Sequence, residues 1–85
     1  QMANIGLAYT HEAKSEFRTA IDLYKLVIDA DTSFPLFQVY WSLARCHINN
    51  NDSSNALLIL REMQIKFSGT TELEKIDRRI KQLST

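Results

Sequence analysis

The spacing of apolar residues restricts this chain to helices over nearly its whole length. Apolar side chains recur every three or four residues, which places them on one face of an α-helix. Two glycines and one proline in 85 residues disfavour a turn-rich β protein. We therefore expect an all-α fold. The helical stretches are expected at about 2–12, 15–30, 33–49, 53–67 and 71–84.

Polar residues mark where these helices should begin and end. Ser15 and one of residues 53–54 are the predicted N-caps of the second and fourth helices, since a serine hydroxyl can accept a hydrogen bond from a first-turn amide. Pro35 suits the first turn of the third helix. Residues 71–74 have the form of a capping box. Residues 49–52 are typical of a helix end, because Asn tolerates left-handed backbone.

Composition excludes several classes of protein. Ten Lys and Arg balance ten Asp and Glu, and a neutral chain lacks the surplus cations of a polybasic nucleic-acid binder. No apolar run approaches the ~18 residues that suggest a membrane span. A single cysteine cannot form an internal disulfide framework. No linker divides the pattern, so we expect one domain over 1–85, and the uncapped start at Gln1 suggests the C-terminal part of a longer chain.

Small residues recur at matching places in two successive helix pairs. Met2-x2-Ile5-Gly6-x2-Tyr9 matches Tyr40-x2-Leu43-Ala44-x2-His47, and Ala20-x3-Tyr24 matches Ala56-x3-Leu60. A small side chain lets a neighbouring helix approach closely. We therefore expect Gly6 to cross Ala20 and Ala44 to cross Ala56.

These motifs resemble the tetratricopeptide repeat, whose pattern is W-x2-L-G-x2-Y followed by A-x3-F and a proline. The last helix resembles a third first half, Leu73-x2-Ile76-Asp77-x2-Ile80. The resemblance implies helical hairpins stacked as a right-handed superhelix: repeat one at 1–33, repeat two at 34–69 and a capping helix at 70–84. The match is degenerate, since the Trp and the terminal Pro are replaced, for example by Tyr40 and Ser68. Helical pairs of another superhelical family are the rival interpretation.

The resemblance also implies a concave groove, lined by the first helix of each repeat, that binds a protein segment. Trp41 is the predicted apolar anchor and Arg45 the donor to a carboxylate or a backbone carbonyl, because Trp and Arg are enriched among interface hot spots. Packing of Trp41 inside the molecule remains the alternative. The predicted partner-binding residues are Ala3, Leu7, Thr10, Gln38, Trp41, Arg45 and Asn49.

Residues that could carry chemistry are few and scattered. Cys46, His47 and His11 do not supply the four paired ligands of a structural zinc site. We expect His47 to be a satisfied core histidine, Cys46 a packing residue and His11 a solvated loop residue. The two glycines cannot build a phosphate cradle. The basic cluster of the last helix is interleaved with acids, which favours a solvated face. It comprises Lys75, Arg78, Arg79 and Lys81.

The sequence therefore predicts a protein-protein interaction module with no enzyme activity, cofactor, metal or nucleic-acid partner. The alternative is a structural end of a longer repeat scaffold, or a self-association module. The carboxylate clamp of chaperone-binding relatives is disfavoured, because the first-helix stripe at Ala3, Leu7 and Thr10 has no cation. Residues 65–71 are similar to a junction in bacterial envelope members of the family, so the compartment stays open between cytoplasm and envelope.

Overall fold

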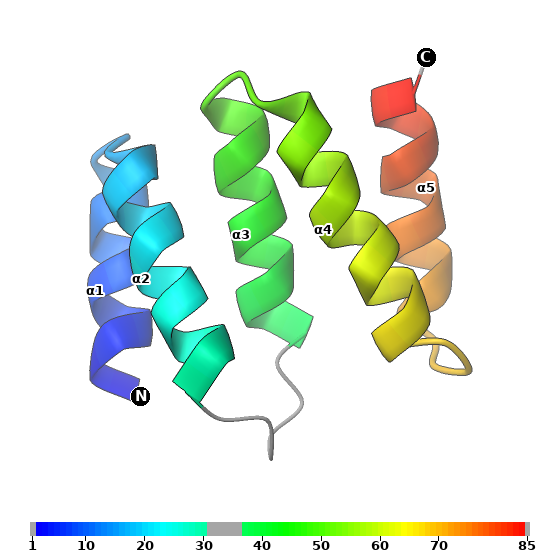
Figure 1. Ribbon diagram of the computed structural model, residues 1–85, viewed down its shortest axis with the longest axis horizontal. Coiled ribbons are helices and arrows are strands. Elements are labelled where there is room, and N and C mark those ends of the chain that lie inside the picture. The colour runs from blue at the N-terminus through cyan, green and yellow to red at the C-terminus, as the bar shows by residue number, and fades with distance from the viewer. Residues whose placement is uncertain (1, 31–36, 85) are drawn as a thin grey trace.

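The computed structural model describes residues 2–30 and 37–84, and every regular element in them is an α-helix (Figure 1). The prediction of an all-α fold is confirmed. The predicted start of the third helix, at Ser33 to Pro35, lies outside the described residues. None of the helices in the described part is long and apolar enough to cross a membrane. The helices are α1 (Met2–Ala13), α2 (Phe17–Ala30), α3 (Phe37–Asn49), α4 (Ser53–Lys66) and α5 (Leu73–Ser84).

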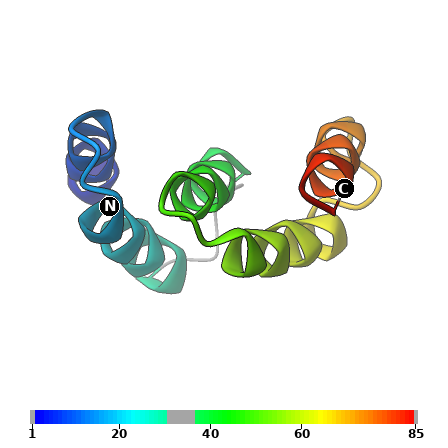
Figure 2. The same ribbon diagram turned by 90° about the horizontal axis from the view of Figure 1, so that it is seen from above.

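Consecutive helices run antiparallel and form two layers. Each helix packs on the next one along the chain, from α1 to α5. Figure 2 shows α1, α3 and α5 on one side and α2 and α4 on the other. In the same view α3 is set back between α1 and α5, so that their side of the molecule is concave.

The central helix α3 belongs to two hydrophobic clusters. One face of α3 packs with α1 and α2 around the fully buried Tyr24, and Leu43 belongs to this cluster. Another face packs with α4 and α5 around Leu60 and Ile76, and Tyr40 belongs to this second cluster. Burial on both sides explains why α3 has far more buried residues than α1 or α5.

The helices α1 and α3 end in the same way. Ser15 and Asn51 both have left-handed backbone, with φ of 63° and 60°. The next residue then donates its N–H to a carbonyl five residues earlier, which is the Schellman geometry of a helix end. Ser15 therefore terminates α1, and its prediction as the N-cap of α2 is wrong. The bonds are Glu16 N–H to His11 C=O (2.9 Å) and Asp52 N–H to His47 C=O (2.8 Å).

The start of α4 also uses a different residue from the one predicted. Asp52 caps α4, since its carboxylate accepts the Asn55 N–H at 3.3 Å. The serines at 53–54 are the first residues of that helix. Before α5, the Thr70 hydroxyl accepts the Glu72 N–H at 3.3 Å, one residue ahead of the predicted capping box. Several polar residues in a row can each supply a cap, and spacing alone does not choose among them.

The predicted crossing at Gly6 is wrong. Gly6 is exposed, and a Cβ added there would meet nothing within 4 Å. The buried small residue of α1 is Ala8, which precedes the buried Ala44 by 36 residues, as Ala20 precedes the buried Ala56. The predicted buried position of α1 therefore differs from the observed one by two residues. Both positions were acceptable from the sequence, because the apolar residues around Gly6 and around Ala8 both follow helical spacing.

Candidate functional site

Two of the predicted binding residues of α1 have exposed side chains in the structure. Leu7 is half exposed, and the exposed Thr10 donates its hydroxyl to the Gly6 carbonyl at 3.0 Å. The side chain of Ala3 lies outside the described part of the chain. Thirty-six residues later, Leu7 corresponds to Leu43, which packs in the cluster shared with α2. The predicted α1 stripe therefore matches the face of α3 that packs against α2.

The same correspondence identifies the α1 residues that match the two chief predictions on α3. Ile5 corresponds to Trp41, and Tyr9 corresponds to Arg45. Ile5 is half-buried against the first cluster, and the exposed Tyr9 makes an edge contact with Tyr24, with ring centroids 5.8 Å apart. Neither residue was among the predicted set.

Arg45 is engaged in an ion pair with Glu12 of α1. Its Nε donates to Glu12 Oε2, and its Nη2 donates to Glu12 Oε1 at 2.9 Å and to Ser42 Oγ at 3.1 Å. The Tyr24 hydroxyl of α2 donates to the same Glu12 Oε1 at 2.9 Å. We call this network the α1/α3 junction (Glu12, Tyr24, Ser42 and Arg45). Arg45 was predicted to donate to a carboxylate or a backbone carbonyl of a partner, and within the chain it donates to the carboxylate of Glu12.

The α1/α3 junction is strongly polarised. The Glu12 side chain is 12% exposed and that of Arg45 is 39% exposed. Burial by itself raises the pKa of the Glu12 carboxyl, but hydrogen bonds from Arg45 and Tyr24 outweigh it and hold the pKa below its usual range. Burial and the neighbouring Glu12 charge raise the pKa of the Cys46 thiol to about 12, which keeps Cys46 a neutral packing residue.

Trp41 lies on the other side of α3 and is half-buried. Its ring stacks on Phe37, with centroids 5.7 Å apart and planes 17° apart. The Lys75 ammonium of α5 lies 4.8 Å from the Trp41 ring centroid and 5.6 Å from that of Phe37. Trp41 thus packs within the molecule and keeps part of its surface open. Gln38 and Asn49, near the two ends of α3, are exposed.

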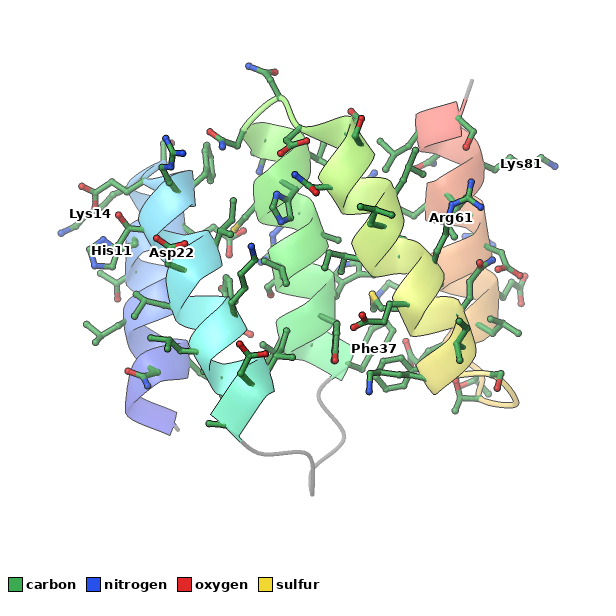
Figure 3. The ribbon with its side chains drawn as sticks, in the orientation of Figure 1. His11, Lys14, Asp22, Phe37, Arg61 and Lys81 are labelled. Carbon is green, nitrogen blue, oxygen red and sulfur yellow. The ribbon has the colours of Figure 1, made fainter. Side chains whose placement is uncertain are left out.

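A shallow depression of about 120 Å³ adjoins Trp41. Its lining comes from α3 and α5 alone, which are neighbours on the concave side. We call it the Trp41 notch. Lys81 is absent from its lining, and Figure 3 shows this lysine extending away from the stack. The notch is lined by Trp41, Lys75, Arg78, Arg79 and Gln82.

Among the described residues, the lining of the notch includes three cations and no acidic side chain. Asp77 accepts a hydrogen bond from Gln64 of α4 at 2.7 Å. Glu74 is exposed and accepts a hydrogen bond from Arg78 Nη2 at 3.5 Å, in an ion pair at the surface of α5. Arg79 donates to Gln82 at 3.2 Å. Three of the four residues in the predicted basic cluster therefore face one depression.

Sequence reasoning missed the binding potential of these cations. Residues 75, 78 and 79 stand three and four positions apart, which places them on one helix face. That spacing was a usable signal, but their proximity to Trp41 depends on how α5 packs beside α3. Glu12 was missed for the same reason, since Arg45 follows it by 33 residues.

The histidines differ from their predictions in detail. His47 is buried as predicted, but its Nδ1 has no hydrogen-bond partner and lies 3.8 Å from Asp52 Oδ2. Burial lowers the pKa of His47. His11 lies in α1, where its Nδ1 is 2.8 Å from Glu16 Oε1, so its prediction as a loop residue is wrong. The described residues contain no group of three His, Cys, Asp or Glu side chains that could hold a metal ion.

No protein-family model matches the chain, and no curated protein or solved structure matches it. We therefore infer its function from the contacts, burial and charge of the described residues. These include a half-buried tryptophan and three cations that line one depression.

Proposed function

We propose that this chain is a protein-interaction module of the tetratricopeptide type. It binds a segment of another protein on the concave side formed by α1, α3 and α5. The observation that carries the proposal is Trp41, a large aromatic residue left half open beside cations on that side. Trp and Arg supply contact area and hydrogen-bond donors at interface hot spots. The proposal includes no catalysis, cofactor, metal or nucleic-acid partner.

The corrected register supports the family part of the proposal. Leu7-Ala8-x2-His11 aligns with Leu43-Ala44-x2-His47, and each is followed by a buried alanine, Ala20 or Ala56. This order of large, small and ring-bearing residues is similar to the L-G-x2-Y and A-x3-F order of the repeat. We retain repeat one at 1–33, repeat two at 34–69 and the capping helix at 70–84.

The proposed mechanism is burial on a rigid surface. Within α3, the Phe37 ring stacks on the Trp41 ring. From α5, the Lys75 ammonium lies over the same indole. A partner side chain can cover the open part of the indole without reordering the receptor. Because little conformational freedom is lost by the receptor, a few anchors are enough for specific binding.

A selection from a random peptide-display library tests this proposal. We expect peptides selected on the immobilised protein to lose binding to the variant Trp41→Ala. They should retain binding to Leu58→Ala, which truncates an exposed apolar residue on α4. Circular dichroism checks that both variants are folded. Peptides that bind Trp41→Ala as tightly as the original chain would contradict the proposal.

A second candidate is packing on a further helix or self-association through α1. Leu7 is 50% exposed, whereas the corresponding Leu43 is 1% exposed in its cluster with α2. A helix placed on α1 as α2 is placed on α3 would bury Leu7. Sedimentation velocity over a range of concentrations tests self-association, which Leu7→Gln should weaken and the exposed control Leu26→Gln should not. A monomer at every concentration counts against this form of the candidate.

A further inference from the structure

We infer that the Trp41 notch binds an acidic protein segment, with an Asp or Glu carboxylate at the cations and an adjoining apolar side chain on the indole. This inference rests on the proposed function and specifies the chemistry of the partner. It is argued from the charge of the notch, its size and a comparison with the α1/α3 junction.

The α1/α3 junction provides an example of the interaction within the chain. There a carboxylate from the neighbouring helix, Glu12, receives the guanidinium of Arg45 and the hydroxyl of Tyr24. One carboxylate thus satisfies both the guanidinium of α3 and the hydroxyl of the buried Tyr24 of α2. Hydrogen bonds of this kind, between ionised partners, are stronger than those between neutral groups.

The neighbouring junction between α3 and α5 has the cations but no equivalent acid on α3. The α3 residue that corresponds to Glu12, 36 positions later, is Ile48. On α5, Asp77 accepts a hydrogen bond from Gln64, and Glu74 pairs with Arg78 in an exposed contact at 3.5 Å. No acidic side chain is among the described residues that line the notch, so its three cations are in local surplus. A carboxylate from outside would balance them as Glu12 balances Arg45.

The position of Lys75 couples this charge to an apolar contact. Its ammonium lies over the rings of Trp41 and Phe37, so that charge and indole surface adjoin each other. Arg78 adds a planar donor that suits a carboxylate. A segment with an acidic residue beside an apolar residue can use both surfaces at once.

The size of the notch favours a side chain over a larger anion. Its volume of about 120 Å³ is well below the ~300–1,000 Å³ of pockets for drug-sized ligands and cofactors. The chain as a whole has no net positive charge to attract a nucleic acid. An acidic protein segment is the occupant that fits both observations.

Nuclear magnetic resonance titration with two defined peptides tests the inference. The probe is acetyl-Gly-Glu-Phe-Glu-Gly-amide, and its matched control has Gln in place of both Glu residues. Trp41 is the only tryptophan, so its indole N–H gives a single reporter signal. We expect the acidic peptide to shift this signal and the α5 amides, and to bind about tenfold more tightly than the Gln peptide, equivalent to ~1.4 kcal/mol.

Paired variants locate the effect. Lys75→Gln combined with Arg78→Gln should remove the preference for the acidic peptide. Lys14→Gln combined with Arg18→Gln makes the same change in charge at exposed positions outside the notch and should keep that preference. Preserved amide spectra show that both variants are folded, and Arg78→Lys should retain part of the preference because it keeps the charge.

The opposing outcomes are distinct. Equal binding of both peptides at Trp41 would overturn the acidic preference and leave the proposed function standing. Shifts that avoid Trp41 and α5, or no shifts with either peptide, would overturn the inference, while the library selection tests the proposed function separately. The same shifts produced by inorganic phosphate alone would indicate a general anion site and would also overturn it.

Discussion

The α1/α3 junction and the Trp41 notch both contain cations and aromatic side chains, but they differ in whether the chain supplies a carboxylate between its helices. The α1/α3 junction is closed, because Glu12 bonds to Arg45 and to the Tyr24 hydroxyl. The Trp41 notch is open, because no acid crosses from α3 and the cations of α5 adjoin an aromatic ring. Whether the chain supplies the carboxylate therefore decides whether such a junction stabilises the fold or is free to bind a partner.

The largest effect is expected from breaking the closed junction. In Glu12→Gln, Arg45 loses its counter-ion and Tyr24 loses a charged acceptor. We expect the free energy of unfolding to fall by about 2 kcal/mol, below the ~3–5 kcal/mol for a fully buried pair because water reaches the partly exposed Arg45. Urea denaturation followed by circular dichroism measures this change.

A matched control for this prediction comes from the open junction. Glu74→Gln removes an acid whose only pairing is the exposed contact with Arg78, so unfolding should change little. Adding Arg45→Met to Glu12→Gln should restore part of the lost stability, since no unpaired charge remains. An unchanged midpoint in Glu12→Gln alone would show that the α1/α3 junction does not stabilise the fold.

A smaller loss is expected from truncating the aromatic residue of the notch. Trp41→Ala removes the stacking on Phe37 and the contact with Lys75, but the indole is only half-buried. We expect the free energy of unfolding to fall by about 1–2 kcal/mol, less than the ~3–5 kcal/mol typical of a fully buried aromatic residue. Denaturation of Trp41→Phe, which keeps an aromatic ring, should show a smaller change. A loss as large as 4 kcal/mol would make Trp41 a core residue.

Acid should weaken the closed junction, because its hydrogen bonds depend on an ionised Glu12. The pKa of Glu12 lies below its usual range in the folded chain, so folding releases a proton from this group when the pH is near that range. The contribution of Glu12 is therefore fully present above its unfolded pKa and is lost as the pH falls through the folded pKa. Below the usual pKa of a carboxyl, the stability difference between the original chain and Glu12→Gln should narrow.

The comparison of the original chain with Glu12→Gln contains its own control, since all other titrating groups are common to the two proteins. His47 also contributes to acid sensitivity, because its buried ring has a lowered pKa and the unfolded chain takes up a proton first. That contribution cancels in the difference between the two chains. A difference that stays constant from neutral to acid pH would contradict the role assigned to the Glu12 charge.

The sequence was sufficient to predict the helices because each depends on its own spacing. The apolar stripe of α5, for example, follows from Ile76 and Ile80 without reference to any other element. Register between helices is different, since a shift of two residues exchanged Gly6 for Ala8 while leaving an acceptable helical pattern. Within the described residues the extents of the helices were therefore predicted closely, but the capping residues of α2 and α4 and the buried face of α1 were not.

The candidate site was harder to predict because its contacts join distant parts of the chain. Trp41 and Arg45 were identified as notable residues, but the pairing of Arg45 with Glu12 depends on the placement of α1 beside α3. In the same way, the approach of Lys75 to Trp41 depends on how α4 positions α5. Side-chain type indicated what these residues can do, and packing determined which of them remain open.

The smallest effect on stability is expected from Lys75, and it best separates the two junctions. Lys75 is exposed, and its contact with the Trp41 ring contributes about 0.5–1 kcal/mol at such a site. In Lys75→Gln the free energy of unfolding should fall by no more than this amount, with Lys14→Gln as the control. Binding of the acidic peptide should nevertheless weaken, because the charge is lost where the carboxylate binds. If Lys75→Gln instead unfolds as readily as Glu12→Gln, the cations of α5 hold the fold together as Arg45 does, and the notch is a second closed junction.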